Sequence, residues 1–145
     1  MAIYLDHAAT TPMLPAAIDA YARQMAEVGN ASSLHSQGRA VRKSVEESRE
    51  LIARAAGCDA SEIIFTASGT EANNLAIKGF FWSYPSKKTI VISSVEHHAV
   101  MDPAQWLAEH EGATVIETPV TPQGVIDLEE LKKIVEAHRD EIAVI

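Results

Sequence analysis

The chain has a single cysteine among its 145 residues, which excludes a disulfide within the chain. That residue, Cys58, follows Gly57 after a predicted helix, and nothing around it marks it as a nucleophile. We interpret it as an ordinary thiol. No apolar run approaches the roughly 18 residues of a membrane-spanning helix. The first residues also lack the basic and apolar parts of a signal peptide, so we expect a cytoplasmic protein.

Basic residues are scarce as well. The chain has 12 lysines and arginines against 20 aspartates and glutamates, a formal charge of −8. A surface that binds nucleic acid or an anionic membrane needs clustered positive charge, so the composition argues against both partners. With 47% hydrophobic residues and no linker-like stretch, residues 1–145 are expected to lie within one globular domain that acts on a small molecule.

Apolar periodicity and turn residues predict strands that alternate with helices. The predicted helices cover about 15–28, 41–56, 70–82, 98–110 and 127–138, and the predicted strands 62–66, 89–92, 113–116 and 142–145. This alternation is typical of an α/β fold with a mostly parallel sheet and helices on both faces. Ligands of such folds bind at the carboxyl ends of the strands. No helix follows the last strand, so we expect an incomplete sheet and a chain that is marginally stable or associates.

The segment Phe65 to Asn74, FTASGTEANN, combines a predicted strand, a turn of small residues and a helix. We expect Thr70 to cap that helix. The first amides of a helix are unpaired and carry partial positive charge, so the turn could bind a phosphate or a carboxylate. An ordinary capped helix would give the same pattern. The segment is neither a P-loop nor a dinucleotide-binding fingerprint.

A second candidate segment is Glu96-His97-His98, which follows a strand and opens a helix. An imidazole there could stack on an aromatic ligand or transfer protons near neutral pH. A surface histidine pair, a zinc site and a hydrolase using Ser68 or Ser93 are alternatives, although the spacings typical of zinc sites and nucleophile elbows are absent. Three lysines near these segments are interpreted as solvated cations; they are Lys78, Lys87 and Lys88.

Taken together, four segments resemble motifs of the pyridoxal-phosphate-dependent cysteine desulfurases in the class V aminotransferase group. They occur in the same order as in that family and cover essentially the whole chain. The segments are YLDHAATTP from Tyr4, GNASSLHSQGR from Gly29, IFTASGTEANN from Ile64 and EHHAV from Glu96.

The resemblance implies that the 67–70 turn binds the phosphate of pyridoxal 5′-phosphate through Gly69 and Thr70, and that His97 stacks on its ring and acts in catalysis. It also implies that the loops of Asp6-His7-Ala8 and Asn30 approach the substrate. The family's usual turn is Ser-Gly-Gly-Thr or Ser-Gly-Ala-Thr, whereas this chain has Ala67-Ser68-Gly69-Thr70. This departure puts in doubt only a contact from a side chain at position 67.

The family reaction converts L-cysteine to L-alanine and an enzyme-bound persulfide, which supplies iron–sulfur or other sulfur-cofactor assembly through an acceptor or scaffold protein. The resemblance further implies the large domain of a fold type I enzyme and a homodimer. In the family, the lysine that binds the cofactor, the ring-binding aspartate and glutamine, the substrate-binding arginine and the reactive cysteine all lie beyond position 145. We therefore expect this chain to be the N-terminal part of such an enzyme and to be inactive alone. The alternatives are a non-catalytic binding or dimerisation module and a selenocysteine lyase-like enzyme.

Overall fold

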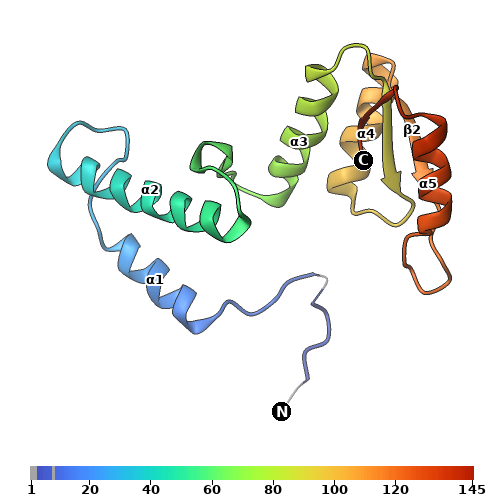
Figure 1. The fold of residues 1–145 in the computed structure, drawn as a ribbon. Helices are drawn as coiled ribbons and strands as arrows, with labels where there is room; N and C mark the ends of the chain where they lie inside the picture. The colour runs from blue at the N-terminus through green and yellow to red at the C-terminus, as the bar shows by residue number, and fades with distance from the viewer. Residues whose placement is uncertain (1–2, 8) are drawn as a thin grey trace. The chain divides into compact units, whose positions relative to one another are not determined.

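The computed structural model describes residues 3–7 and 9–145. The chain divides into two compact units, Met1–Ile64 and Phe65–Ile145. Figure 1 shows the first unit in blue to green and the second in yellow-green to red. Each unit is described by itself below.

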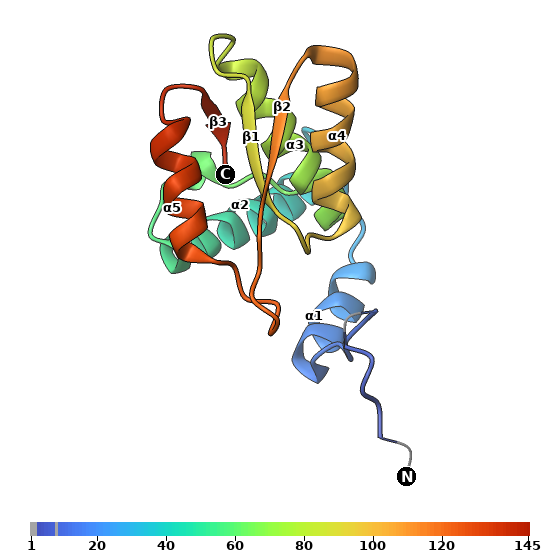
Figure 2. The ribbon, with the colours of Figure 1, turned by 90° about the vertical axis from the view of Figure 1, so that its right-hand side faces the viewer.

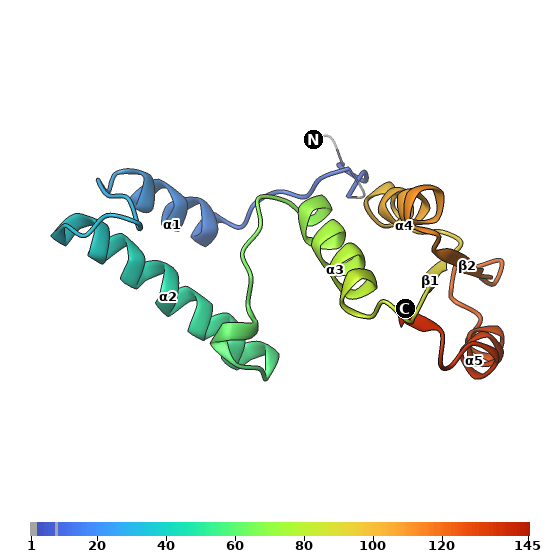
Figure 3. The ribbon, with the colours of Figure 1, turned by 90° about the horizontal axis from the view of Figure 1, so that it is seen from above.

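The first unit consists of α1 (Pro15–Met25), α2 (Ser36–Ala56) and the short 3-10 helix η1 (Ala60–Glu62). Pro15 is the first residue of α1. At this position a backbone N–H would have no acceptor within the helix, so its absence in proline does not destabilise the helix. In Figure 3, α1 lies beside α2, and the Ser44 hydroxyl of α2 donates to Gln24 of α1. Gly57 ends α2 with a φ of 72°, a left-handed conformation that glycine adopts without steric cost. The helix α1, predicted over 15–28, ends at Met25, three residues earlier than expected.

The second unit contains a parallel three-stranded sheet and three long helices. Its elements are α3 (Gly69–Ser83), β1 (Thr89–Ser93), α4 (His98–Glu111), β2 (Thr114–Thr118), α5 (Leu128–Ala137) and β3 (Ile142–Val144). The strand order is β2-β1-β3, and both pairs are parallel. Figure 2 shows α3 and α4 on one side of the sheet and α5 on the other. The predicted α/β architecture with helices on both faces is confirmed.

The core of the second unit lies between the sheet and the α3–α4 pair. All five residues of β1 are buried, because this strand is central and covered on both faces. Ile77 and Phe81 of α3 and Leu107 of α4 pack against Ile90 and Ile92 of β1. This packing sets the positions of the first turns of both helices, which carry the predicted site. Among the described residues, no helix is both long and apolar enough to cross a membrane.

The predicted strand 62–66 is wrong. Glu62 ends η1, and the residues that follow up to the turn form no ladder with any described strand. Ile63 still has extended dihedral angles, with φ −90° and ψ 122°. Ile64 and Phe65 are 67% and 47% exposed. The residues have the expected β preference, but a strand also needs a hydrogen-bonded neighbour, and none of the described strands pairs with them.

Candidate functional site

The turn before α3 is held by two reciprocal hydrogen bonds. The Ser68 hydroxyl oxygen accepts from the Glu71 amide at 3.2 Å, and the Glu71 carboxylate accepts from the Ala67 amide at 2.8 Å. Ser68 has the extended dihedral angles of an N-cap, φ −160° and ψ 162°. The expected cap at Thr70 is therefore wrong, because Ser68 caps the helix, which begins at Gly69.

The main-chain N–H groups of Gly69 and Thr70, between these two hydrogen bonds, have no acceptor in the part of the chain that the structure describes. None of the hydrogen bonds shown for the described residues is donated by the main-chain N–H of Gly69 or Thr70. A Cβ placed on Gly69 would meet no atom within 4 Å, so the space beside its Cα is open. Two unpaired N–H groups beside open space at a helix N-terminus fit a phosphate.

His97 is the N-cap of α4, four residues after the end of β1. Its Nδ1 accepts a hydrogen bond from the Ala99 amide at 3.0 Å. The side chain is exposed, whereas Ala99 is buried. The ring is thus tied to the first turn of α4, and its other edge remains available to a ligand.

Thr70 and His97 line the same cavity, which lies between α3 and α4 and has a volume of about 430 Å³. Asn74 and Lys78 continue its wall along α3, and Asp102 and Trp106 line it from α4. The structure therefore brings together two of the three residues predicted to bind the cofactor, Thr70 and His97, and the third, Gly69, directly precedes Thr70 in the chain. His98, next to His97, pairs instead with Asp102 at 3.1 Å.

The three lysines interpreted as solvated cations all lie over aromatic rings. The Nζ atom of Lys78 is 4.4 Å from the centre of the Trp106 ring inside the cavity. The corresponding distances are 5.8 Å for Lys87 over Tyr84 and 4.6 Å for Lys88 over Phe81. Each ammonium group therefore has an aromatic face as a partner, and the interpretation of the three lysines as solvated cations stays a prediction. The contact of Lys78 with Trp106 joins residues far apart in sequence, and no local pattern could have indicated it.

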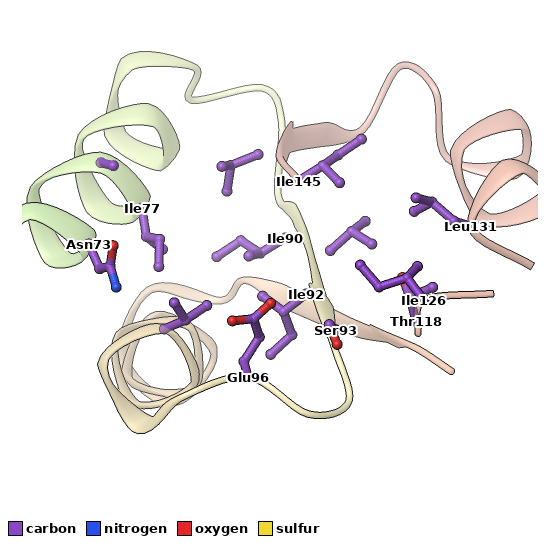
Figure 4. A pocket seen from close by; sticks show the side chains of 14 residues that line it. Asn73, Ile77, Ile90, Ile92, Ser93, Glu96, Thr118, Ile126, Leu131 and Ile145 are labelled. Atoms are coloured by element: carbon purple, nitrogen blue, oxygen red, sulfur yellow. The ribbon is translucent and has the colours of Figure 1, made fainter. Parts of the chain in front are cut away.

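A second cavity, of about 310 Å³, lies at the carboxyl ends of β1 and β2 (Figure 4). Thr118 is only 2% exposed, and its hydroxyl is without a hydrogen-bond partner in the described part of the chain. Asn73 and Glu96 line the opposite wall, while Ile90 and Ile145 supply apolar surface. The rule that ligands bind at strand ends could have indicated this position, but no residue pattern singled out Thr118.

The two loops expected near the substrate belong to the first unit. The His7 ring packs edge-on against Tyr4 with a centre-to-centre distance of 5.3 Å. The Asn30 side chain accepts from the Ser32 amide at 2.9 Å and so closes its own loop. Ala8 lies outside the described residues. The approach of these loops to the substrate stays a prediction.

Among the described residues, the hydrolase and zinc alternatives find no geometric support, whereas His97 and His98 are both exposed, as a surface histidine pair would be. The hydroxyl oxygens of Ser68 and Ser93 accept from the main-chain amides of Glu71 and Val95, and no hydrogen bond within the described part of the chain links either serine to a histidine. Among the described residues, no group of three or more histidine, cysteine, aspartate or glutamate side chains is arranged to hold a metal ion.

Comparison with known proteins decides the family. The aminotransferase class-V family matches residues 3–145. The chain belongs to this family. It is 51% identical over 141 residues to an IscS-like cysteine desulfurase of Mycobacterium tuberculosis, an alignment that covers 94% of this chain and 36% of the relative. The chain thus spans about a third of the length of the curated relatives it matches.

Solved structures of other members have the same fold. A NifS-like protein superposes with a TM-score of 0.82 at 33% identity, over 93% of this chain and 37% of that protein. A structure described as SspA in complex with cysteine superposes with a TM-score of 0.76 at 29% identity. This superposition covers 96% of the present chain and 40% of the SspA chain. The expected fold, an incomplete large domain of this type of enzyme, is therefore supported by structure as well as by sequence.

Proposed function

We propose that this chain is the N-terminal part of a pyridoxal-phosphate-dependent cysteine desulfurase. The observation that carries the proposal is that Thr70 and His97 line one cavity beside two unpaired amides, in a chain 51% identical to an IscS-like cysteine desulfurase. The parent enzyme would convert L-cysteine to L-alanine and an enzyme-bound persulfide. It would act as a cytoplasmic homodimer and pass sulfur to an acceptor or scaffold protein for iron–sulfur or other sulfur-cofactor assembly.

The residues of the cavity fit the cofactor in chemical type. The free amides of Gly69 and Thr70 would hold the phosphate, and the open space above Gly69 lets an oxygen approach the backbone closely. His97 would lie against the pyridine ring with its cap keeping the imidazole in place. When bound, pyridoxal phosphate supplies an electron sink for bond breaking at the substrate's α-carbon.

The chain's own residues bind and orient but do not complete the reaction. Cys58 is partly buried in the first unit, and no hydrogen bond or charged partner is shown for its thiol in the part of the chain that is described. Lys78 is held over Trp106. We therefore propose that the covalent lysine and the sulfur-accepting cysteine belong to the remainder of the parent, and that the 145-residue chain alone is inactive.

Borohydride trapping tests this proposal. The 145-residue chain and the full-length parent are each incubated with pyridoxal phosphate, reduced with borohydride, digested and analysed by mass spectrometry. A stable adduct on one lysine of the parent, outside residues 1–145, is expected, with no defined adduct on the short chain. A single stoichiometric adduct on Lys78, Lys87 or Lys88 would refute the assignment of the covalent lysine to the remainder. Absence of any adduct on the parent would refute the cofactor.

A further inference from the structure

His97 uses its ring nitrogens differently from the other histidines that have ring hydrogen bonds in the described part of the chain. In three of them Nδ1 faces an oxygen acceptor: His98 with Asp102, His110 with the Trp106 carbonyl, and His138 with Glu141, at 3.0–3.1 Å. A carbonyl or ionised carboxylate oxygen can only accept, so these Nδ1 atoms carry the proton. The partner of the His97 Nδ1 is the Ala99 main-chain N–H, which can only donate. This Nδ1 is therefore unprotonated.

We infer that His97 presents a hydrogen-bond donor, Nε2–H, and no acceptor to the ligand of the cavity, so that it cannot take up a proton there while α4 is capped. A neutral imidazole has one N–H and one lone pair. The Ala99 amide occupies the lone pair on Nδ1, which leaves the proton on Nε2. The inference rests on the proposed function for the identity of the ligand, but the state of the ring follows from the cap alone.

This assignment restricts what His97 does in the proposed reaction. Protonation at Nδ1 would break the hydrogen bond to Ala99 and remove the N-cap of α4. A group that removes a proton from the substrate must then be another residue, whereas His97 donates from Nε2 to an oxygen or nitrogen of the ligand. The Ala99 amide is the positioning group, because it fixes both the tautomer and the orientation of the ring.

Nuclear magnetic resonance tests the state of the ring directly. In the 145-residue chain labelled with ¹⁵N, at about pH 8.5, where an ordinary imidazole is neutral, a scalar coupling across the hydrogen bond should join the Ala99 amide nitrogen to Nδ1 of His97. Asp102→Asn is the control, since it alters only the partner of His98 and should leave this coupling intact. A proton on Nδ1 of His97, or no coupling at either pH 8.5 or 9, would overturn the inference.

Two substitutions of His97, made in the full-length apoprotein, distinguish the role of Nδ1 from the role of Nε2. His97→Asn keeps an acceptor where Nδ1 lies and removes Nε2. His97→Gln can reach the position of Nε2 and loses the cap. Both variants lose the imidazole ring that stacks on the ligand, so a difference between them reports only the loss of the group at the position of Nδ1 or of Nε2.

We expect the Asn variant to keep the melting temperature within about 2 °C and to bind pyridoxal phosphate roughly tenfold more weakly than the Gln variant. The Gln variant should melt about 2–4 °C lower. The reverse order of affinities would overturn the inference. If the unmodified apoprotein binds no pyridoxal phosphate while the coupling is present, the proposed function fails and the ring assignment stands.

Discussion

The two units differ in how much of their structure they bury. In the described part of the first unit, only Gly38 and Ala53 are buried, and large apolar side chains such as Ile18, Tyr21 and Leu51 are more than half exposed. The second unit has a continuous core of which Phe81, Ile90 and Leu107 are 1% exposed or less. The candidate site belongs entirely to the second unit. Residues that must be held to within fractions of an ångström are thus placed on the unit with a core.

The largest expected effect tests whether that core carries the stability. Leu107→Ala should destabilise the second unit by about 3–5 kcal/mol, because Leu107 is fully buried and its loss leaves a cavity. The matched control in the first unit is Leu51→Ala, at a position 63% exposed, which should change stability by less than about 0.5 kcal/mol. Urea unfolding followed by circular dichroism measures both. Equal destabilisation by the two substitutions would contradict the contrast between the units.

The first unit nevertheless has close backbone packing at two glycines, Gly29 and Gly38. Gly38 is the tighter of the two. A Cβ at this position would lie 2.5 Å from the Asn30 carbonyl oxygen and 2.7 Å from Ser33. Gly38→Ala should therefore cost about 1–3 kcal/mol, because the loop backbone must move. Gly79→Ala in α3 is the control: its Cβ meets no atom within 4 Å, so we expect a gain of about 0.5–1 kcal/mol from helix propensity.

Amide hydrogen exchange, read residue by residue, measures both glycine substitutions. Faster exchange confined to the loop around Asn30 and the start of α2 is the expected signature of Gly38→Ala. A neutral Gly38→Ala would mean that the loop shifts without cost and that the close approach of its backbone to Gly38 does not stabilise the first unit.

Local sequence patterns were sufficient to locate most helices and three of the four predicted strands along the chain. Periodicity placed α3, α4 and α5 and the strands β1, β2 and β3 to within about two residues of their bounds. The same patterns put His97 after β1 at the start of α4, and this is where the structure has it. The helices, the strands and the position of His97 depend on residues close in sequence, which is why the sequence alone could predict them.

The features that the sequence predicted wrongly or did not indicate depend on distant partners or on a small shift along the chain. The strand 62–66 has suitable residues but no neighbouring strand. The contact of Lys78 with Trp106 joins two helices, and the unpartnered hydroxyl of Thr118 is visible only once the strands are assembled. At the turn, both Ser68 and Thr70 are good caps, and sequence alone could not decide which residue begins the helix.

The smallest expected effect concerns that choice of cap. Ser68→Ala should destabilise the second unit by about 1 kcal/mol, because the Glu71 amide loses its acceptor. Ser68→Gly, which restores glycine as in the family's usual turn, should cost only a few tenths of a kcal/mol. Thr70→Ala should change stability by less than about 0.5 kcal/mol, since Thr70 lies inside the helix and its side chain caps nothing.

Thermal unfolding of the three variants ranks these effects. A larger loss for Thr70→Ala than for Ser68→Ala would restore the threonine as the cap and move the start of α3 by two residues. The free amides would then no longer be those of Gly69 and Thr70, because the unpaired donors of a helix are counted from its cap. The rank order of two hydroxyl deletions therefore tests which backbone groups face the cavity, without any ligand being added.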